Sequence, residues 1–170
     1  MMLECLGDRE KTNLWWFPNG GFATINSYLE VGAQSSLIDH CRWLEKLPVY
    51  HKDRYRIFVH AWIDNSLLMS RQIKKKMQWA MYPNDFDEIY LCRNKKMHIV
   101  HGHHQHVHGP LIYKNRSNLD VLAWMAGRLV VGVVDDNKSG GPIDIMEVFG
   151  VNASQTAALT YKLGDIGKEN

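Results

Sequence analysis

Two histidines lie where predicted strands could present them to a ligand. His60 belongs to an apolar run at residues 55–63 (Tyr-Arg-Ile-Phe-Val-His-Ala-Trp-Ile), and His103 follows a second apolar run at residues 96–100. Neutral imidazole is the commonest nitrogen ligand of zinc, iron and manganese-type ions. Gly102 permits a sharp turn that would swing the His103 ring toward a metal. We therefore expect His60 and His103 to bind one divalent cation, either manganese, iron or zinc.

A plainer interpretation of each histidine stays open. A single histidine in an apolar strand is often a buried side chain that only hydrogen-bonds its neighbours. The spacing of His60 and His103 also matches no closed zinc motif, which needs cysteines or a His-x-x-x-His pair. The chain has nine histidines, and six of them fall within residues 98–108. Three of these share one face of an extended segment and could capture zinc or nickel, or could form an exposed polar loop: His104, His106 and His108.

The carboxylates offer less than a two-metal site normally needs. Aspartates usually bridge and hold hard cations, yet no Asp-x-His or Gly-Asp-x-x-Asp group occurs in the sequence. Asp120 ends a predicted strand after the His103 loop, where it could orient His103 or cap the next segment. We expect Asp120 and His101 to support the two metal ligands from outside the coordination shell. Nucleophile-elbow, P-loop and dinucleotide motifs are absent, and Cys92 is expected to be buried.

The composition is that of an ordinary globular protein. The chain has 170 residues, of which 45% are hydrophobic and 22% charged, and its formal net charge is +2. So small a charge gives no electrostatic basis for binding nucleic acid or a membrane. Three cysteines without a C-x-x-C spacing argue against a disulfide framework and fit a reducing compartment. With no signal peptide or membrane-spanning stretch in the sequence, we expect a cytoplasmic location.

Apolar periodicity predicts helices first and mostly strands afterwards, an α+β fold class or half of a larger layered fold. Helices are expected at residues 1–10, 21–31, 36–47 and 67–81. Strands are expected at residues 55–63, 96–100, 111–113, 117–119, 128–134 and 144–149. Because the later connections are short, we expect an antiparallel meander. A partial domain would cover residues 1–150, helical over 1–52 and strand-rich over 53–150, before a flexible tail at 151–170.

Three stretches together resemble the calcineurin-like metallophosphoesterases, especially the bacterial Ser/Thr phosphoprotein phosphatases. Residues 19–28 resemble the segment that precedes the helical insert of this family, and residues 58–61 resemble its Phe-Val-His-Ala-Gly motif. Residues 100–103 and 115–120 resemble its Val-His-Gly-His-Thr and Asn-Arg-Ile-Asn-Ile-Asp-Thr-Gly-Ala stretches. The likeness runs from the first residues to about Val148.

The resemblance implies the C-terminal half of a layered β-sandwich flanked by helices, with two divalent metals and water-mediated hydrolysis of phosphomonoesters. By this analogy His60 and His103 are ligands of the second metal. The family's Gly-Asp-x-His-Gly, Gly-Asp-x-x-Asp-Arg-Gly and Gly-Asn-His-Glu motifs are absent from the sequence. Those motifs supply the first metal's ligands, the bridging aspartate, the asparagine ligand and the general acid. The first residues resemble what usually follows the last motif, so we expect a truncated domain.

The chain also departs from the family pattern within the matching stretches. Trp62 replaces the glycine after His-Ala, and His104 replaces the threonine after the second histidine. Residues 79–81 (Trp-Ala-Met) replace a Trp-Ile-Arg that offers a phosphate-binding arginine, and residues 121–122 replace a Thr-Gly pair. Each change weakens the case for hydrolysis by this chain alone.

Three functions stay open at this point. The first is a metal-dependent Ser/Thr protein phosphatase, truncated and inactive alone, acting on a phosphorylated protein or a small phosphoester. The second is a degenerate, non-catalytic module derived from such a phosphatase, in which a second copy or a partner chain covers the surface left by the missing half. The third is a histidine-rich protein that buffers metal ions through residues 98–108.

Overall fold

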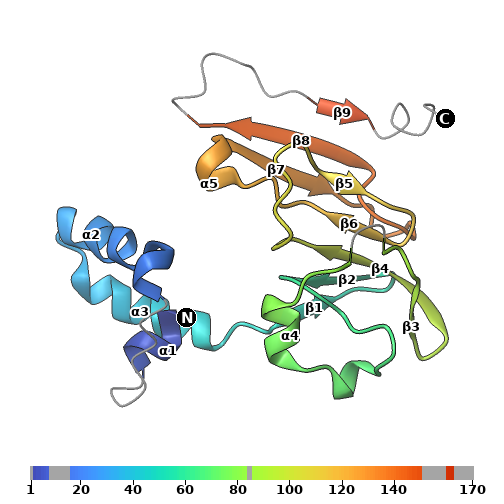
Figure 1. Cartoon of the computed structure of the whole chain (residues 1–170), viewed down its shortest axis with the longest axis horizontal. Coiled ribbons are helices and arrows are strands. Elements are labelled where there is room, and N and C mark those ends of the chain that lie inside the picture. The colour runs from blue at the N-terminus through green and yellow to red at the C-terminus, as the bar shows by residue number, and fades with distance from the viewer. Residues whose placement is uncertain (1, 8–15, 84–85, 151–159, 163–170) are drawn as a thin grey trace. The chain divides into compact units, whose positions relative to one another are not determined.

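The computed structural model describes residues 2–7, 16–83, 86–150 and 160–162, and the remaining residues are drawn as a thin grey trace in Figure 1. The chain divides into two compact units, Met1–Pro48 and Val49–Asn170. The described part of the first unit is helical, and the second unit contains every described strand. The fold class is therefore α+β, as predicted.

The first unit contains four helical segments in its described part. They are α1 (Met2–Gly7), η2 (Phe17–Gly21), α2 (Phe22–Glu30) and α3 (Gln34–Glu45). The helices predicted at 1–10, 21–31 and 36–47 match α1, α2 and α3, although residues 8–10 lie outside the described residues. The short η2 was not predicted, because its Pro-Asn-Gly-Gly sequence is typical of a turn. Gly21 of this segment packs so tightly that an added Cβ would lie 2.8 Å from the Trp16 ring.

Six strands of the second unit form a mixed sheet in the order β1-β2-β4-β6-β5, with β3 pairing β4 (Figure 1). Their bounds are β1 (Tyr50–Lys52), β2 (Arg56–Val59), β3 (Tyr90–Cys92), β4 (Lys95–His101), β5 (Leu111–Ile112) and β6 (Arg116–Asn118). The central pairs β2–β4 and β4–β6 are parallel, whereas β1, β3 and β5 pair with their neighbours in antiparallel fashion.

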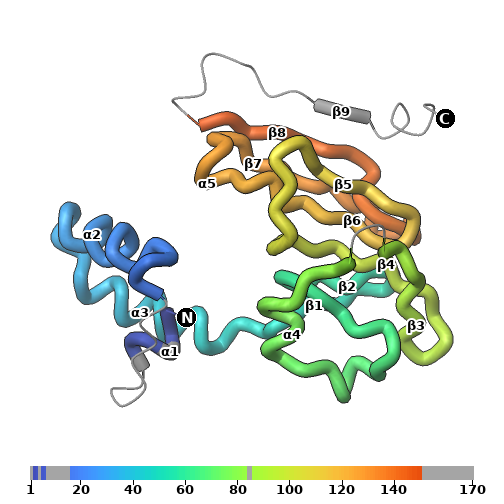
Figure 2. Tube along the Cα trace, in the orientation of Figure 1, coloured from blue at the N-terminus to red at the C-terminus, as the bar shows by residue number. Residues whose placement is uncertain are grey.

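The predicted antiparallel meander is therefore wrong for the centre of this sheet. Parallel neighbours need long crossover connections, and residues 60–94 and 102–115 provide them. Figure 2 follows these two connections as the chain leaves one strand and returns to the same end of the next. The three-residue strands β1 and β3 were also missed, because so few residues give little periodicity. Strand β1 lies within the 1–52 segment that had been assigned to the helical part.

The long helix predicted at residues 67–81 is wrong as well. This stretch forms only a 3-10 turn, η3 (Met69–Arg71), and a short helix, α4 (Lys74–Trp79). Between them Gln72 has an extended backbone, and its side chain bonds three backbone groups of the preceding loop. Its amide oxygen accepts from Asp64 N at 3.0 Å, and its amide nitrogen donates to the carbonyls of Asp64 and Leu67. These local bonds compete with the helical ladder.

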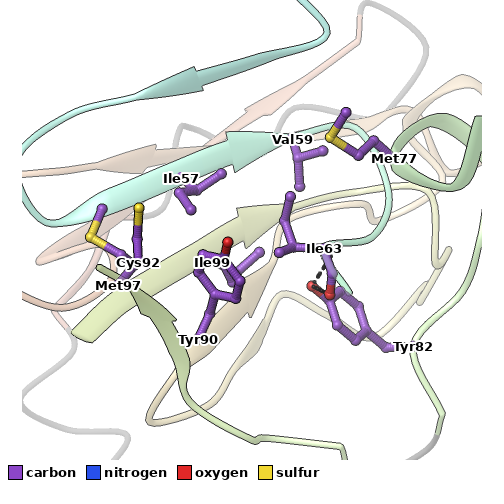
Figure 3. Close-up of a cluster of buried hydrophobic side chains, with 9 residues drawn as sticks. All are labelled: Ile57, Val59, Ile63, Met77, Tyr82, Tyr90, Cys92, Met97 and Ile99. Carbon is purple, nitrogen blue, oxygen red and sulfur yellow. Dashed lines mark hydrogen bonds between the residues drawn. The ribbon is translucent and has the colours of Figure 1, made fainter. Parts of the chain in front are cut away.

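The main hydrophobic core lies on one face of the mixed sheet (Figure 3). Its members are Ile57, Val59, Ile63, Met77, Tyr82, Tyr90, Cys92, Met97 and Ile99. Two hydroxyl groups in this core need partners: the Tyr82 hydroxyl accepts a hydrogen bond from Ile63 N at 3.0 Å, and the Tyr90 hydroxyl donates to the Leu67 carbonyl at 3.1 Å. Cys92 is buried, as predicted. Burial of this face fixes the register of β2 and β4 and thereby the positions at which their ends emerge.

A second sheet, β7-β8-β9, is antiparallel. It contains β7 (Arg128–Val133), β8 (Asp144–Phe149) and β9 (Thr160–Lys162), and the one-turn helix α5 (Ala123–Ala126) precedes β7. A smaller core of Val121, Val130 and Ile145 includes both β7 and β8. The flexible tail predicted at 151–170 lies outside the described residues, apart from β9. None of the helices in the described part of the chain has the length and apolar character that a membrane span requires.

Candidate metal centre

The parallel pairing of β2 and β4 brings the two predicted ligands to the same edge of the sheet. His60 directly follows β2, and His103 comes two residues after β4 ends. The His60 carbonyl accepts a hydrogen bond from Gly102 N at 3.0 Å, so the two strand ends are tied together by their backbones. On the other side, Ala61 N donates to the Met77 carbonyl of α4 at 2.8 Å. His60 and His103 therefore start from anchored backbone positions.

The two imidazole rings meet through one nitrogen each. His60 Nε2 lies 3.2 Å from His103 Nδ1, and the ring centroids are 4.9 Å apart at an interplanar angle of 55°. His60 is exposed and His103 is half-buried, so solvent reaches this pair. The structure thus brings together the two residues that the sequence predicted as ligands of one ion. Their role as ligands remains a prediction.

The second ring nitrogen of His103 forms a hydrogen bond with the last residue of α4. His103 Nε2 lies 3.2 Å from the Trp79 carbonyl oxygen, which can only accept a hydrogen bond. The proton of a neutral His103 therefore resides on Nε2, and Nδ1 presents its lone pair toward His60. The Trp79 ring also contacts the His103 ring edge-on, with centroids 5.7 Å apart. This contact could not be predicted from the sequence, because any residue can provide a backbone carbonyl at a helix end.

The surroundings of His60 favour its neutral form. Neighbouring atoms that shield its ring from water lower the pKa of His60, and the nearby His103 lowers it further. The Asp120 carboxylate acts in the opposite direction and offsets part of this effect. A neutral imidazole is the form that can coordinate a metal, so the net shift favours ligation near neutral pH.

His101 is buried at the end of β4 and makes two hydrogen bonds. Arg116 NH1 donates to His101 Nε2 at 3.1 Å, and His101 Nδ1 donates to the Gly102 carbonyl at 3.0 Å. Burial lowers the pKa of His101 to about 4, with a smaller contribution from the Arg116 charge in the same direction. His101 was predicted to support the metal ligands, and its only route to them in the described structure is through the Gly102 backbone.

Asp120 was predicted either to orient His103 or to cap the next segment, and its hydrogen bonds fit the second role. Asp120 Oδ1 accepts a hydrogen bond from Leu122 N at 2.9 Å, which stabilises the turn at Leu122, where φ is +59°. Its carbonyl accepts from His106 N at 2.9 Å and holds the histidine loop against β6. Within the described residues Asp120 makes no hydrogen bond to His103. Its charge nevertheless acts on His60, as described above.

The remaining histidines of residues 98–108 do not gather around one point. His106 and His108 are exposed, and their ring centroids lie 6.4 Å apart. Among residues 2–7, 16–83, 86–150 and 160–162, no group of three or more His, Cys, Asp or Glu side chains is arranged to hold a metal ion. Trp62, which stands where the family pattern has a glycine, packs against the main core. Its ring centroid lies 6.0 Å from that of Tyr82. The pair of His60 and His103 is therefore the best candidate centre in this part of the chain.

No known family matches the sequence, and no characterised protein or solved structure shows significant similarity to the chain. The metallophosphoesterase resemblance accordingly remains a hypothesis that rests on the motifs and on the paired histidines.

Proposed function

We propose that the chain binds one divalent metal ion through His60 Nε2 and His103 Nδ1. The observation that carries this proposal is the 3.2 Å separation of these two nitrogens. Nitrogen ligands lie about 2.1 Å from zinc, so two of them at 90° to 109° around one ion stand about 3.0 to 3.4 Å apart. The observed separation falls inside this range. To bind an ion between them, each ring would turn its lone pair from the facing nitrogen toward a common point.

The proton positions also suit a metal. His103 keeps its proton on Nε2 against the Trp79 carbonyl, so its Nδ1 is free to coordinate. His60 need only carry its proton on Nδ1 for its Nε2 to coordinate as well. Without metal, the same Nε2 would donate to His103 Nδ1 and give the observed contact. Metal binding would therefore replace one hydrogen bond between the rings.

The function that we assign to this centre is that of a metal-dependent phosphomonoesterase of the Ser/Thr protein phosphatase type. A bound divalent ion would neutralise the charge of a phosphoryl oxygen and lower the pKa of a coordinated water. The layered β-sandwich of the metallophosphoesterases is part of the same proposal, and the two β-sheets of the second unit are compatible with it. The described residues offer only two ligands, so water, phosphate oxygens or another polypeptide would complete the coordination. We expect hydrolysis by the chain alone to be slow or absent.

The experiment is a titration of the metal-free chain with Mn²⁺ and Co²⁺, followed by inorganic phosphate. We expect one ion per chain, and phosphate binding only to the metal-loaded form. His103→Ala should weaken ion binding by about 100-fold, because one of two protein ligands is lost, whereas His108→Ala at an exposed loop position should leave it unchanged. Any hydrolysis of a small aryl phosphate with Mn²⁺ should also disappear in His103→Ala. Absence of ion binding would overturn the centre itself, and ion binding without phosphate binding would overturn the phosphoesterase assignment.

A non-catalytic binding module is the second candidate, because the outer face of β7 and β8 is apolar and exposed. Leu129 lies opposite Val148, and Val131 lies opposite Met146. The exposed fractions of these four side chains range from 37% to 53%. The adjoining helix α5 adds Trp124 and Met125, which are 81% and 61% exposed. With a large side chain offering on the order of 150–250 Å², these six residues expose roughly 600 Å², at the upper end for a monomer surface.

We assign this face to contact with a second copy of the chain. A two-fold contact of two such faces would bury roughly 1,200 Å² in total, which is the lower end for stable interfaces. The two apolar pairs would then meet as facing sheets. Sedimentation equilibrium should show a dimer, and Val131→Lys with Val148→Lys should give a folded monomer. A wild-type chain that stays monomeric at about 100 μM, well above the dissociation constant of a typical stable dimer, would contradict this assignment.

A further inference from the structure

The backbone around His103 forms a tight and strained turn. His104 N donates to the Gly102 carbonyl at 2.7 Å, two residues back, and His103 between them has a φ of +63°. A positive φ with a bond between residues i and i+2 is the signature of the γ-turn, a rare conformation for a non-glycine residue. Such strain persists only where surrounding contacts hold it, and it occurs often at functional sites. The contacts that hold this turn therefore decide where the His103 ring points.

The Gly102 carbonyl is the fixed point of this turn. It accepts two hydrogen bonds, one from His104 N and one from His101 Nδ1 at 3.0 Å. The amide of Gly102 is also bonded, to the His60 carbonyl at 3.0 Å. The backbone N–H and carbonyl of one residue, Gly102, thus connect the strand end that carries His60, the buried His101 ring and the turn that carries His103.

Arg116 determines which nitrogen of His101 can donate. A guanidinium group has no acceptor and does not lose its proton in proteins, so the His101 Nε2 that faces Arg116 NH1 at 3.1 Å must present a lone pair. The proton of His101 then sits on Nδ1, where it bonds the Gly102 carbonyl. With the opposite tautomer, both contacts would be lost. Arg116 therefore acts on the turn through the His101 ring.

The Arg116 side chain is itself fixed, although it is a buried cation. Its Nε donates to the Phe86 carbonyl, and its guanidinium lies over the rings of Tyr113 and Tyr82 at 4.0 and 5.1 Å from their centroids. No carboxylate lies within 4.0 Å of it in the described part of the chain. Burial of a charge without a carboxylate partner is costly, so its contacts must serve it by other means, here aromatic faces and neutral acceptors.

We propose that Arg116 and His101 are positioning residues for the candidate metal centre, acting through the Gly102 carbonyl to hold His103 Nδ1 toward His60. This inference rests on the proposed function, because it assigns the relay to metal binding. Neither residue touches the ion. Arg116 fixes the His101 tautomer, His101 anchors the carbonyl, and the anchored turn aims the His103 ring.

Two amide variants of His101 separate positioning from simple core packing. The side-chain amide nitrogen of asparagine occupies about the position of Nδ1, whereas that of glutamine reaches about the position of Nε2. His101→Asn therefore keeps a donor for the Gly102 carbonyl, whereas His101→Gln can turn its amide oxygen toward Arg116 but keeps no donor at the position of Nδ1. Both variants are polar and smaller than histidine, so a purely structural role predicts similar losses of thermal stability and similar metal affinities for the two.

The experiment compares Co²⁺ affinity and thermal unfolding of the full chain for wild type, His101→Asn and His101→Gln. We expect His101→Gln to weaken Co²⁺ binding by about 10- to 100-fold, the range found for residues that orient metal ligands. We expect His101→Asn to stay within a few-fold of wild type, while the two variants unfold at similar temperatures. Equal Co²⁺ affinities for the two variants would overturn the relay.

A metal-free measurement keeps this test separate from the proposed function. In the wild type, the ¹⁵N chemical shift of His103 Nδ1 should be that of an unprotonated nitrogen that accepts a hydrogen bond from His60. The same signature should survive in His101→Asn and be lost in His101→Gln. A wild type that shows the signature but binds no Co²⁺ would overturn the metal function alone. Retention of the signature in His101→Gln would overturn the positioning role alone.

Discussion

The mixed sheet carries two pairs of histidines, one at the ends of β2 and β4 and the other buried on β4 itself. The surroundings of the two pairs are opposite. His60 and His103 lie at the solvent-accessible edge, where one nitrogen of each ring faces the other. His98 and His101 lie on β4 and are buried, with exposed fractions of 5% and 3%. Their rings are bonded to fixed protein partners, Ser117 for His98 and Arg116 for His101. The difference teaches that solvent access and a second ring facing the first, rather than residue type, mark a candidate ligand.

The two groups also differ in what protonation does. Protonation of His60 or His103 would block metal coordination, and solvent would stabilise the resulting charge. Protonation of the buried pair would place a charge in the interior, and burial lowers the pKa of both His98 and His101 to about 4. The inner pair should therefore govern acid stability, and the outer pair should govern ligand binding.

The largest predicted effect is a loss of stability in mild acid caused by the buried pair. The unfolded chain takes up a proton at each histidine near the ordinary pKa of 6.5, whereas the folded chain does so only near 4. Between these values the unfolded state binds more protons, so the free energy of unfolding falls as pH falls. The loss should reach several kcal/mol by pH 4, since each pKa unit is worth about 1.4 kcal/mol. Urea denaturation at several pH values measures it.

The control for this prediction changes one buried and one exposed histidine in turn. His98→Gln removes a titrating group and should make the pH dependence between 6.5 and 4 less steep, even if the variant is less stable at pH 7. The matched change His108→Gln, in the exposed loop, should leave the steepness unchanged. Equal steepness for His98→Gln and wild type would show that the buried ring does not govern acid stability.

The next effect concerns the outer pair. His60→Ala should weaken Co²⁺ binding by about 100-fold, or about 2.7 kcal/mol, because one of two protein ligands is lost. The free energy of unfolding without metal should change by less than about 0.5 kcal/mol, as expected for an exposed side chain. Calorimetric titration and urea denaturation measure the two quantities. If the variant unfolded far more easily yet kept its Co²⁺ affinity, His60 would belong with the structural histidines.

A smaller effect should follow from crowding His98, one of the two buried histidines. An added Cβ at Gly141 would lie 2.6 Å from His98 Nε2 and 2.8 Å from Ser117 Oγ, whose mutual hydrogen bond is 2.8 Å long. Gly141→Ala should lower the free energy of unfolding by about 1–3 kcal/mol, as overpacking usually does. Metal affinity should stay the same. Gly150→Ala is the matched control, because its nearest neighbour would be 3.6 Å away, and thermal unfolding compares the two.

Sequence patterns predicted the meeting of His60 and His103 but gave a wrong sheet topology. An antiparallel neighbour would place the ends of the two predicted strands at opposite edges of the sheet. It is the parallel pairing of β2 and β4 that brings them together, and it follows from the long connection between them. The strand-end position of each histidine was visible in the apolar runs, whereas the direction of pairing depends on contacts far apart in sequence.

Other parts of the site carried no usable signal. The Trp79 carbonyl that receives His103 is a backbone group, and α4 ends there because the backbone of Ala80 is extended, with φ −80° and ψ 146°. Arg116 was visible only within residues 115–120, the stretch that resembles the family pattern, and it lies just before the strand predicted at 117–119. Its role could not be predicted, since its contacts come from two segments far from it in sequence, one with Tyr82 and Phe86 and the other with His101.

The smallest predicted effect tests whether Asp120 belongs to the outer pair. Its carboxylate raises the pKa of His60 against the lowering caused by burial and by His103. Asp120→Asn keeps a side-chain oxygen for the Leu122 N–H but removes the charge, so the pKa of His60 should fall further. The direction of this change is the test, because the Asp120 charge is the contribution that raises the pKa of His60. NMR titration of the His60 ring measures it, with Asp136→Asn, an exposed carboxylate in the β7–β8 turn, as control. An unchanged His60 pKa would leave Asp120 as a turn residue only, and a rise would mean that the substitution had rearranged the Leu122 turn.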